Sequence, residues 1–306
     1  MNISKPVTKA VIPAAGFGTR FLPQTKAMPK EMMPIIDKPI IQYVVEELVA
    51  AGIKDIIIIG SSNKRAIEDH FDIANEDLLN NLRAGGEKKR PLLEQMEQIA
   101  NMANFIYLRQ KGPYGNATPI LNAAHMLGGE PFIYKWADDF FMTNGNPSST
   151  KQLIETYNKY GGSVLACKQV VADDEYDKYG IVGGPEVEDG ILDVQRIIEK
   201  PGKTNAPSSL ASVSNYLFTP RMIEEVERLG AAYDGHGEFT MQPAIQAMLD
   251  GGDKVYAREI KGGKFCDTGD KLEYLKTMFD FGLEHETLGP QLRTYLREKA
   301  AELNIK

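Results

Sequence analysis

The amino-acid sequence predicts a doubly wound α/β fold with a mixed sheet, a small antiparallel insertion and C-terminal helices. Three observations support this prediction. The first sixty residues carry strand, helix and strand patterns in turn, the alternation continues to about residue 170, and short segments divided by glycine-rich turns follow at 171–218. Strands that alternate with helices indicate βαβ units and a parallel sheet, whereas short alternating runs are typical of antiparallel strands.

The first βαβ unit stands near the N-terminus. The run KAVIPA at 9–14 is short and apolar, as in a buried strand. In PIIQYVVEELVAAG at 39–52, apolar residues recur at helical spacing, Pro39 suits the first helical position and Gly52 suits the end, so this run predicts a helix. The β-branched run DIIIIG at 55–60 indicates a strand that is buried on both faces.

The remaining elements follow from the same patterns. Further helices are expected at 64–84, 92–102, 120–127, 151–159, 220–229, 238–250, 269–282 and 290–302. Further strands are expected at 105–110, 131–137, 163–170 and 254–260, and the runs ILDVQRIIEK and LASVSNYLF alternate like antiparallel strands. The sequence contains no internal repeat and no interdomain linker, so we expect a single domain over 1–306.

Composition and charge narrow the classes of function. Hydrophobic residues make up 42% of the 306 residues and charged residues 25%, as in ordinary globular proteins. The net charge of −7 argues against a protein that binds nucleic acid through bulk electrostatics. No apolar run approaches the roughly 18 residues of a membrane helix. The N-terminus lacks a signal-peptide core and the two cysteines form no disulfide framework, so a cytoplasmic location is expected.

Three loops are the places where a ligand site is expected. In open α/β sheets, ligands bind outside the carboxyl ends of the parallel strands. The loops that follow the strands at 9–14, 105–110 and 131–137 carry the runs GFGTR, GPYGNAT and the pair Asp138–Asp139.

The first of these loops, PAAGFGTRFLPQTKAMPKEMMP at 13–34, combines glycines with basic side chains. Gly16 and Gly18 allow the backbone to approach a ligand closely, and Arg20 and Lys30 offer charge to phosphate oxygens. It is not a P-loop, because no GK[ST] follows. It is not a dinucleotide fingerprint either, because Phe21 stands where the third glycine would be. A polyphosphate loop and a plain structural turn both remain open on spacing alone.

The second and third loops offer base-reading and metal-binding groups. Gln110 can pair with a base edge, although a tight turn with Asn116 or Thr118 capping the next helix is an alternative. The carboxylate of Asp138 can hold a hard cation such as Mg²⁺, and Asp267, far along the chain, can supply a second ligand.

Purely structural roles are an alternative for the charged residues that lie further along the chain. Asp267 or Asp270 could instead cap the helix that follows, and Asp270 suits that role well. Glu199 and Lys200 end a strand-like run and could be a solvated surface pair.

Nucleophilic hydrolysis is disfavoured by the absence of its motifs. The four histidines show no metal-ligand spacing such as HExxH, and no G-x-S-x-G elbow is present.

Taken together, the run VIPAAGFGTRFLPQTKAMPKEMMPIIDKPIIQYVVEELVAAGI resembles the N-terminal signature of bacterial UTP–glucose-1-phosphate uridylyltransferases, which belong to the sugar-nucleotidyltransferase superfamily. Further matches are YLRQK, HFD at 70–72, YGIV at 179–182, EKP at 199–201, GEFTMQPAI at 237–245 and FCDTGDKLEYL at 265–275. The resemblance implies a Rossmann-like, GT-A-like nucleotidyltransferase domain. Residues 1–170 would bind the nucleotide, 171–265 the sugar, and 266–306 would form C-terminal helices.

The resemblance also implies roles for single residues. Those expected around the nucleotide phosphates are Ala15, Gly16, Gly18, Thr19, Arg20 and Lys30, with Glu31 near the nucleotide. Gln110 and Gly115 would read the uracil, and Asp138 and Asp267 would hold Mg²⁺. Gly180, Glu199 and Lys200 would bind the glucosyl phosphate, and the catalytic charges would be Arg20, Lys30 and Lys200. A homo-oligomer, dimer or tetramer, is expected as well.

The implied reaction is attack of the phosphate of glucose 1-phosphate on the α-phosphorus of UTP, giving UDP-glucose and pyrophosphate. The attacking phosphomonoester has a second pKa near ~6 and is already ionised at neutral pH, so no general base is needed. Positioning and charge neutralisation should therefore dominate catalysis.

Two stretches depart from the family pattern and leave alternatives open. PYGNATP replaces a GLGHA-type run, and IYKWADDFF, with Lys135 and Trp136, replaces a run such as VLLPDD. Base and sugar specificity, and the choice between Asp138 and Asp139 as metal ligand, depend on these loops. The same chemistry with dTTP or another sugar 1-phosphate, a nucleotide-sugar glycosyltransferase, and a non-catalytic homologue are the alternatives.

Overall fold

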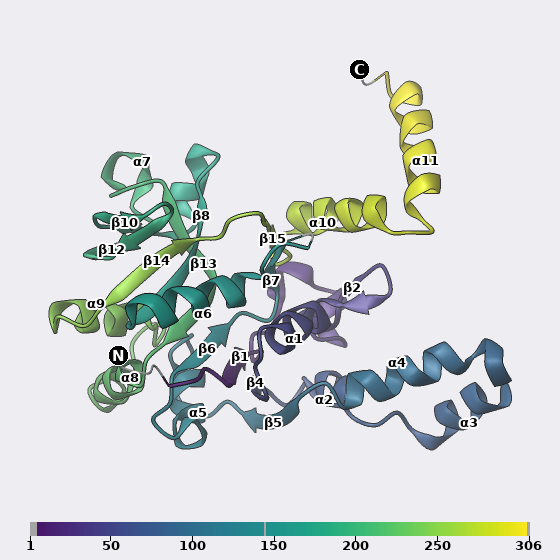
Figure 1. Ribbon diagram of the computed structural model, residues 1–306, viewed down its shortest axis with the longest axis horizontal. Helices are drawn as coiled ribbons and strands as arrows, with labels where there is room; N and C mark the ends of the chain where they lie inside the picture. Colours follow the sequence, from purple (N-terminus) through teal and green to yellow (C-terminus); the bar gives the residue numbers. More distant parts are fainter. Residues whose placement is uncertain (1–4, 144, 305–306) are drawn as a thin grey trace.

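A large mixed sheet forms the centre of the molecule (Figure 1). The computed structural model describes residues 5–143 and 145–304. Over this part of the chain, nine strands lie in the order β10-β11-β14-β8-β13-β6-β1-β4-β5, and β9 and β12 extend the sheet from β13. Their bounds are β1 Lys9–Pro13, β4 Asp55–Gly60, β5 Asn104–Arg109, β6 Phe132–Lys135, β8 Ser163–Gln169, β9 Gly180–Gly183, β10 Glu186–Glu188, β11 Ile191–Asp193, β12 Arg196–Glu199, β13 Leu210–Phe218 and β14 Val255–Glu259.

The sheet is parallel where the βαβ pattern predicts it and antiparallel in the insertion. β1 pairs in parallel with both β4 and β6, and β4 pairs in parallel with β5. β13 runs antiparallel to β6, β8 and β9, and β9 pairs antiparallel with β12. The α/β class with a mixed sheet and a small antiparallel part is therefore confirmed.

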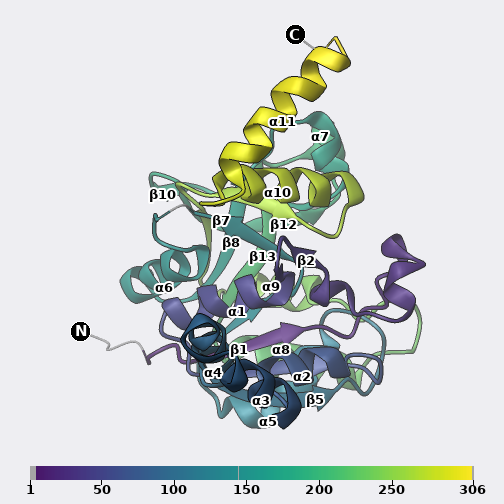
Figure 2. The same ribbon diagram turned by 90° about the vertical axis from the view of Figure 1, so that its right-hand side faces the viewer.

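Helices cover both faces of the sheet, as Figure 2 shows. Their bounds are α1 Ile40–Ala50, α2 Arg65–Phe71, α3 Glu76–Ala84, α4 Arg90–Ala100, α5 Thr118–Leu127, α6 Ser149–Tyr160, α7 Gly202–Asn205, α8 Arg221–Ala231, α9 Gln242–Asp250, α10 Lys271–Glu284 and α11 Gly289–Glu302. No helix of the described residues is both long and apolar enough to cross a membrane.

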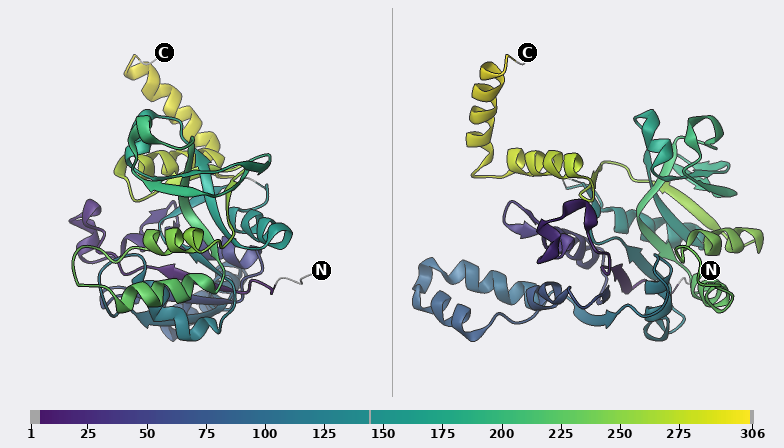
Figure 3. Two further views of the ribbon diagram at one scale, coloured as in Figure 1. Left: turned by 90° about the vertical axis from the view of Figure 1, so that its left-hand side faces the viewer. Right: turned by 180° about the vertical axis from the view of Figure 1, so that it is seen from behind.

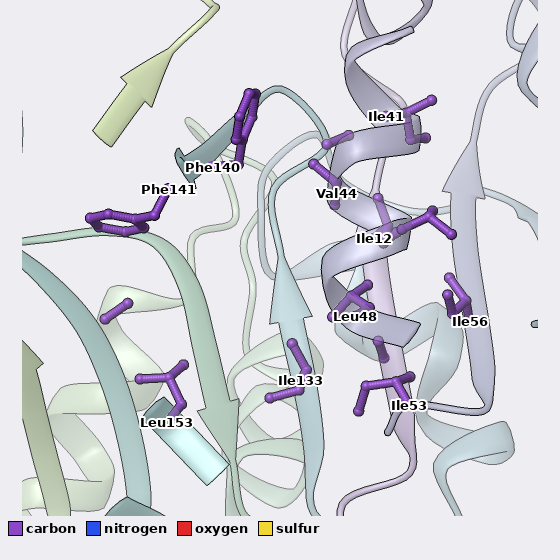
Figure 4. Close-up of a cluster of buried hydrophobic side chains, with 14 of the residues drawn as sticks. Ile12, Ile41, Val44, Leu48, Ile53, Ile56, Ile133, Phe140, Phe141 and Leu153 are labelled. Atoms are coloured by element: carbon purple, nitrogen blue, oxygen red, sulfur yellow. The ribbon is translucent and has the colours of Figure 1, made fainter. Parts of the chain in front are cut away.

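Two hydrophobic clusters, one on each face, follow from the alternation of side chains along the strands. Ile12 and Ile56 point to one face, where α1 and α6 pack (Figure 4). Val11 and Ile57 point to the other face, where α5, α8 and α9 pack. Strands buried on both faces read as continuous apolar runs, which explains why DIIIIG gave a clear prediction.

Two expected helices differ from the structure. The helix expected over 64–84 breaks into α2 and α3, because Asn75 caps the second helix by accepting the N–H of Leu78. The helix expected over 238–250 begins only at Gln242, since the backbone of Phe239 pairs with Tyr114 and Ala117 of another loop.

Two short strands escape sequence prediction and carry two of the candidate metal ligands. β7 (Asp139–Met142) pairs antiparallel with β15 (Lys264–Asp267), so that Asp139 stands opposite Asp267. A smaller hairpin joins β2 (Pro34–Ile35) to β3 (Lys38–Pro39).

Two helical pairs project from the body. The α3–α4 hairpin extends to one side, and α11 stands away from the sheet beyond α10 (Figures 1 and 3). The loops that follow β1, β5 and β6 lie together, because the loop after β1 contacts both of the others.

Candidate active site

The loop after β1 folds back on itself through three short 3-10 turns, η1 Thr19–Phe21, η2 Gln24–Lys26 and η3 Lys30–Met32. Gly18 has φ 64, and a Cβ there would lie 3.1–3.2 Å from side-chain atoms of Thr25 and Lys30. The hydroxyl of Thr25 donates to the carbonyl of Gly18 over 2.7 Å. The loop therefore brings Lys30 against both glycines, since a Cβ on Gly16 would lie 3.8 Å from Lys30 Cε.

Two aspartates and an arginine meet at Gly269. A Cβ on Gly269 would lie 3.2 Å from Asp138 Oδ2, 3.2 Å from Asp267 Oδ1 and 3.5 Å from Arg20 Nη1. Lys30 donates a hydrogen bond to Oδ2 of Asp138, and Arg20 donates to the carbonyl of Gly269 over 3.3 Å. The structure thus collects Arg20, Lys30, Asp138 and Asp267, which the sequence spreads from position 20 to position 267.

Hydrogen bonds from neighbouring residues hold the aspartates in place. Thr268 donates both its backbone N–H and its hydroxyl to the carbonyl of Asp138. Ser214, in β13, donates its hydroxyl to the carbonyl of Asp139 over 2.8 Å. The Oδ2 of Asp267 accepts from the hydroxyl of Tyr179 over 3.3 Å. These contacts fix the turn between β6 and β7 against the end of β15.

The charge of Asp138 acts on both neighbouring carboxylates, Asp139 and Asp267. Burial, followed by the charge of Asp138, raises the pKa of Asp267. Burial and the charges of Asp138 and Asp267 raise the pKa of Asp139 well above its usual range. Burial lowers the pKa of Lys30, but the negative charges of Asp138 and Glu31 have the larger effect, so the pKa of this lysine is raised. Such a site gains free energy when it accepts a further cation.

The donor set fits a hard divalent cation. Within the described ranges, no group of three or more His, Cys, Asp or Glu side chains is arranged around one metal position. The carboxylates of Asp138 and Asp267 converge at Gly269, where a Cβ would lie 3.2 Å from an oxygen of each. Mg²⁺ is usually held by one or two carboxylates and takes its other ligands from water and substrate phosphates.

Glu31 and Lys135 have partners of their own. Glu31 is fully buried and accepts hydrogen bonds of 3.1 and 2.8 Å from Lys64, which precedes α2. This pair anchors the loop that carries Lys30, and contact between Glu31 and the nucleotide stays a prediction. Lys135 is also fully buried and pairs with Glu47 of α1 at 2.9 Å. Its role is therefore to join β6 to α1.

The second loop packs tightly on the segment before α9. Gly115 has φ 144, and a Cβ there would lie 2.1 Å from the carbonyl oxygen of Phe239, so only glycine fits. Asn116 Oδ1 accepts the N–H of Met241 over 2.8 Å, and the hydroxyl of Thr118 donates to the carbonyl of Pro113. The alternative that Asn116 or Thr118 caps α5 is therefore wrong, since no side chain caps that helix.

The two stretches that depart from the family pattern touch each other. Tyr134, in β6, donates its hydroxyl to the carbonyl of Asn116 over 2.6 Å. The ring of Trp136 packs edge-on against Tyr134, with 5.9 Å between ring centroids. The changes in PYGNATP and in IYKWADDFF are thus parts of one packed unit.

The residues expected at the sugar come together where β9 begins and β12 ends. Glu199 is the partner of Gly180 in the antiparallel pair, and a Cβ on Gly180 would lie 2.9 Å from Glu199 Oε2. Glu199 is an exposed residue whose carboxyl is partly desolvated, and this partial burial raises its pKa against the effects of Lys200 and of a hydrogen bond from Gln242. Lys200 has φ 48, and its N–H donates to the carbonyl of Tyr179 over 3.1 Å.

Tyr179 is the residue that sequence reasoning missed. Its hydroxyl contacts Asp267 and its carbonyl contacts Lys200, so it joins the expected metal residues to the expected sugar residues. The run YGIV was visible in the sequence, but nothing in it indicated this pair of contacts. Asp270 does cap α10, accepting the N–H groups of Leu272 and Glu273.

Comparison with known proteins gives a consistent result. The family described as nucleotidyl transferase matches residues 9–281. A UTP–glucose-1-phosphate uridylyltransferase from Bacillus subtilis is 42% identical over 95% of this chain and 97% of its own, and one from Streptococcus pneumoniae is 39% identical over 99% and 100%.

Solved structures agree with the sequence relatives. A structure described as UTP-bound UGPase from Acinetobacter baumannii superposes with a TM-score of 0.85 at 34% identity, covering 96% of this chain and 99% of that one. A UDP-glucose pyrophosphorylase complexed with UDP-glucose gives a TM-score of 0.80 at 34% identity, covering 92% and 100%.

Proposed function

The chain belongs to the nucleotidyl transferase family, among its UTP–glucose-1-phosphate uridylyltransferases, and we propose that it makes UDP-glucose and pyrophosphate from UTP and glucose 1-phosphate. The observation that carries this proposal is the convergence of Arg20, Lys30, Asp138 and Asp267 at Gly269. A reaction between two phosphate anions needs this kind of site, where positive charge stands beside carboxylates that can hold a cation.

The bond changes require no proton transfer. An oxygen of the sugar phosphate forms a bond to the α-phosphorus of UTP, the bond from that phosphorus to the bridging oxygen of the β-phosphate breaks, and its electron pair leaves with pyrophosphate. Because the attacking phosphate has a second pKa near ~6, it is ionised at neutral pH. The lack of a nucleophile–base pair in the sequence agrees with this chemistry.

The basic residues supply the charge that the reaction develops. Lys30, held against Gly16 and Gly18, faces the phosphates and stabilises the departing pyrophosphate together with Arg20. Lys200 orients the attacking phosphate from the sugar side. The remaining nucleotide contacts are assigned to Ala15, Thr19, Gln110 and Gly115, and the sugar contacts to Gly180 and Glu199.

Mg²⁺ is the proposed cofactor, with Asp138 and Asp267 as its protein ligands. The convergence of the two carboxylates at Gly269, beside Arg20, supports this assignment. When bound, the ion supplies charge neutralisation to the phosphates. Asp139 is the weaker candidate, because the side-chain atoms nearest to a Cβ on Gly269 belong to Asp138, Asp267 and Arg20.

The chain is proposed to act as a homo-oligomer in the cytoplasm. Leu272, Leu275 and Phe279 form an exposed stripe along α10, and α11 stands away from the body (Figure 3). An apolar stripe of this kind suits a subunit interface. Cys167 and Cys266 are both free and buried, which suits a reducing compartment.

The functional division of the chain follows from the same assignment. Residues 1–170 would bind the nucleotide, 171–265 the sugar phosphate, and 266–306 would add Asp267 and the interface helices.

A substrate matrix tests the proposed function. Pyrophosphate release would be measured with UTP, dTTP, ATP and GTP against glucose 1-phosphate and other sugar 1-phosphates, with and without Mg²⁺. We expect Mg²⁺-dependent release that is fastest with UTP and glucose 1-phosphate. Release that is faster with dTTP would move the chain to the thymidylyl alternative, and no release with any pair would remove the enzymatic proposal.

A further inference from the structure

Two exposed aromatic rings stack on each other beside the candidate site. The ring centroids of Phe17 and Tyr114 lie 6.2 Å apart with an interplanar angle of 15°. Phe17 remains 63% exposed and Tyr114 54% exposed. Large aromatic side chains that stay this open leave ring faces in contact with water, which is unfavourable unless a ligand covers them.

The pair bridges two loops of the proposed nucleotide site. Phe17 stands between Gly16 and Gly18 in the loop after β1, and Tyr114 precedes Gly115 in the loop after β5. Because β4 lies between β1 and β5 in the sheet, the stacked rings span the carboxyl end of β4. One ring therefore belongs to the expected phosphate loop, and the other to the expected base loop.

Hydrogen bonds hold the backbone next to both rings. The carbonyl of Tyr114 accepts the N–H of Phe239 over 2.8 Å, and Gly115 packs against the same residue. On the other side, Gly18 is fixed by the hydroxyl of Thr25. Both loops thus have backbone contacts of their own next to the rings, and a planar group that stacks here meets a prepared surface.

We propose that Phe17 and Tyr114 form the stacking surface for the base of the nucleoside triphosphate. This inference rests on the proposed function and extends it to two residues that neither the sequence patterns nor the relatives assign. Stacking uses the face of a base and tolerates any base, whereas hydrogen bonds from Gln110 read its edge. The aromatic pair thus contributes affinity for the nucleotide, and Gln110 contributes the choice among bases.

The test separates the base from the phosphates. Isothermal titration calorimetry would measure the binding of UTP and of inorganic tripolyphosphate to the wild-type chain, Phe17→Ala and Tyr114→Ala. Phe17→Tyr and Tyr114→Phe keep both rings and serve as matched controls. Steady-state kinetics would give KM for each substrate, and thermal unfolding would show that each variant is folded.

We expect both alanine variants to bind UTP on the order of 10- to 100-fold more weakly, with unchanged affinity for tripolyphosphate. KM for UTP should rise by a similar factor, while KM for glucose 1-phosphate and the preference for UTP over dTTP stay at their wild-type values. The two controls should match the wild type.

Three results would overturn the proposal: wild-type affinity of both alanine variants for UTP, equal loss of tripolyphosphate affinity, or a rise confined to KM for glucose 1-phosphate. Failure of the proposed function is a separate outcome, because the wild-type chain itself would then release no pyrophosphate from UTP and glucose 1-phosphate.

Discussion

Lys30 donates a hydrogen bond to the carboxylate of Asp138, 108 positions further along the chain. This contact joins the glycine loop after β1 to the turn between β6 and β7. It places the main positive charge of the site beside its main negative charge, with Asp267 and Arg20 around the same point. The basic side chains can neutralise phosphate oxygens directly, and the carboxylates can do so through a bound cation.

Substitution of either aspartate assigned to Mg²⁺ should reduce activity far more than substitution of the neighbouring Asp139. Asp138→Asn and Asp267→Asn should abolish Mg²⁺-dependent turnover, because each removes an anionic oxygen ligand. Asp139→Asn should keep most of the activity, since burial already raises the pKa of Asp139 and favours its neutral form. Initial rates across a Mg²⁺ titration give the comparison. An inactive Asp139→Asn beside an active Asp138→Asn would transfer the ligand role to Asp139.

Removing the hydroxyl of Tyr179 should weaken metal binding and leave folding intact. Tyr179→Phe loses the hydrogen bond to Asp267, a contact of about 0.5–1.5 kcal/mol. The concentration of Mg²⁺ at half-maximal rate should therefore rise about 2- to 10-fold, and Mn²⁺ binding followed by electron paramagnetic resonance should weaken in parallel. Tyr176→Phe, three residues away, is the control. Identical metal titrations for all three proteins would exclude a positioning role for Tyr179.

The buried pair of Lys64 and Glu31 should matter for stability. Lys64→Met leaves the Glu31 carboxylate buried without its partner, which should lower the free energy of unfolding by about 3–5 kcal/mol at pH 7. Urea denaturation measures this loss. Glu31→Gln combined with Lys64→Met should recover a large part of it, because no charge is then left unpaired. A loss below about 1 kcal/mol in the single variant would contradict the assignment of this pair as the anchor of the loop.

The same pair predicts a direction of pH dependence. Burial raises the pKa of Glu31 in the folded state above its ordinary value of 4.5, against the effect of Lys64. In the pH range between the pKa of Glu31 in the unfolded chain and its higher pKa in the folded protein, the folded state binds more protons than the unfolded state. The contribution of Glu31 to the free energy of unfolding therefore falls as the pH rises through this range. Lys64→Met should raise the folded-state pKa of Glu31 further, because the charge that opposes the effect of burial is removed. The loss of unfolding free energy in this variant should therefore be smaller at pH 5 than at pH 7. A destabilisation that grows toward acid pH would contradict this sign.

The exposed stripe on α10 should mediate self-association. Leu275 is 55% exposed, and a charge there would face the proposed partner subunit. Leu275→Asp should shift the molecular mass measured by light scattering after gel filtration from a multiple of the chain mass to that of one chain. Lys276→Asp, on the next residue of the same helix, is the control. A wild-type chain that elutes as a monomer would remove the oligomer proposal.

Much of the architecture follows from the sequence because the strands concerned are buried on both faces. DIIIIG and KAVIPA give clear apolar runs, and the loops after such strands are the places where ligands bind in this fold class. The glycines of the first loop and the paired aspartates could therefore be picked out, and the structure brings Arg20, Lys30, Asp138 and Asp267 together.

The remaining features depend on contacts between distant segments. β7 and β15 have four residues each and lie more than 100 positions apart, so no local pattern shows that Asp139 pairs with Asp267. The two tertiary contacts of Tyr179 and the burial of Lys135 against Glu47 are equally non-local. The stacking of Phe17 on Tyr114 also joins two loops that the chain separates widely.

The central claim is that charge neutralisation by the glycine loop drives the transfer. The most direct test compares the kcat of Lys30→Ala with the kcat of Lys26→Ala. Lys26 lies in the same loop but is exposed. With UTP, glucose 1-phosphate and Mg²⁺ at saturation, we predict that Lys30→Ala lowers kcat on the order of 10²- to 10³-fold while it remains folded at the assay temperature, and that Lys26→Ala keeps a kcat near the wild-type value. A wild-type kcat in Lys30→Ala would contradict the account.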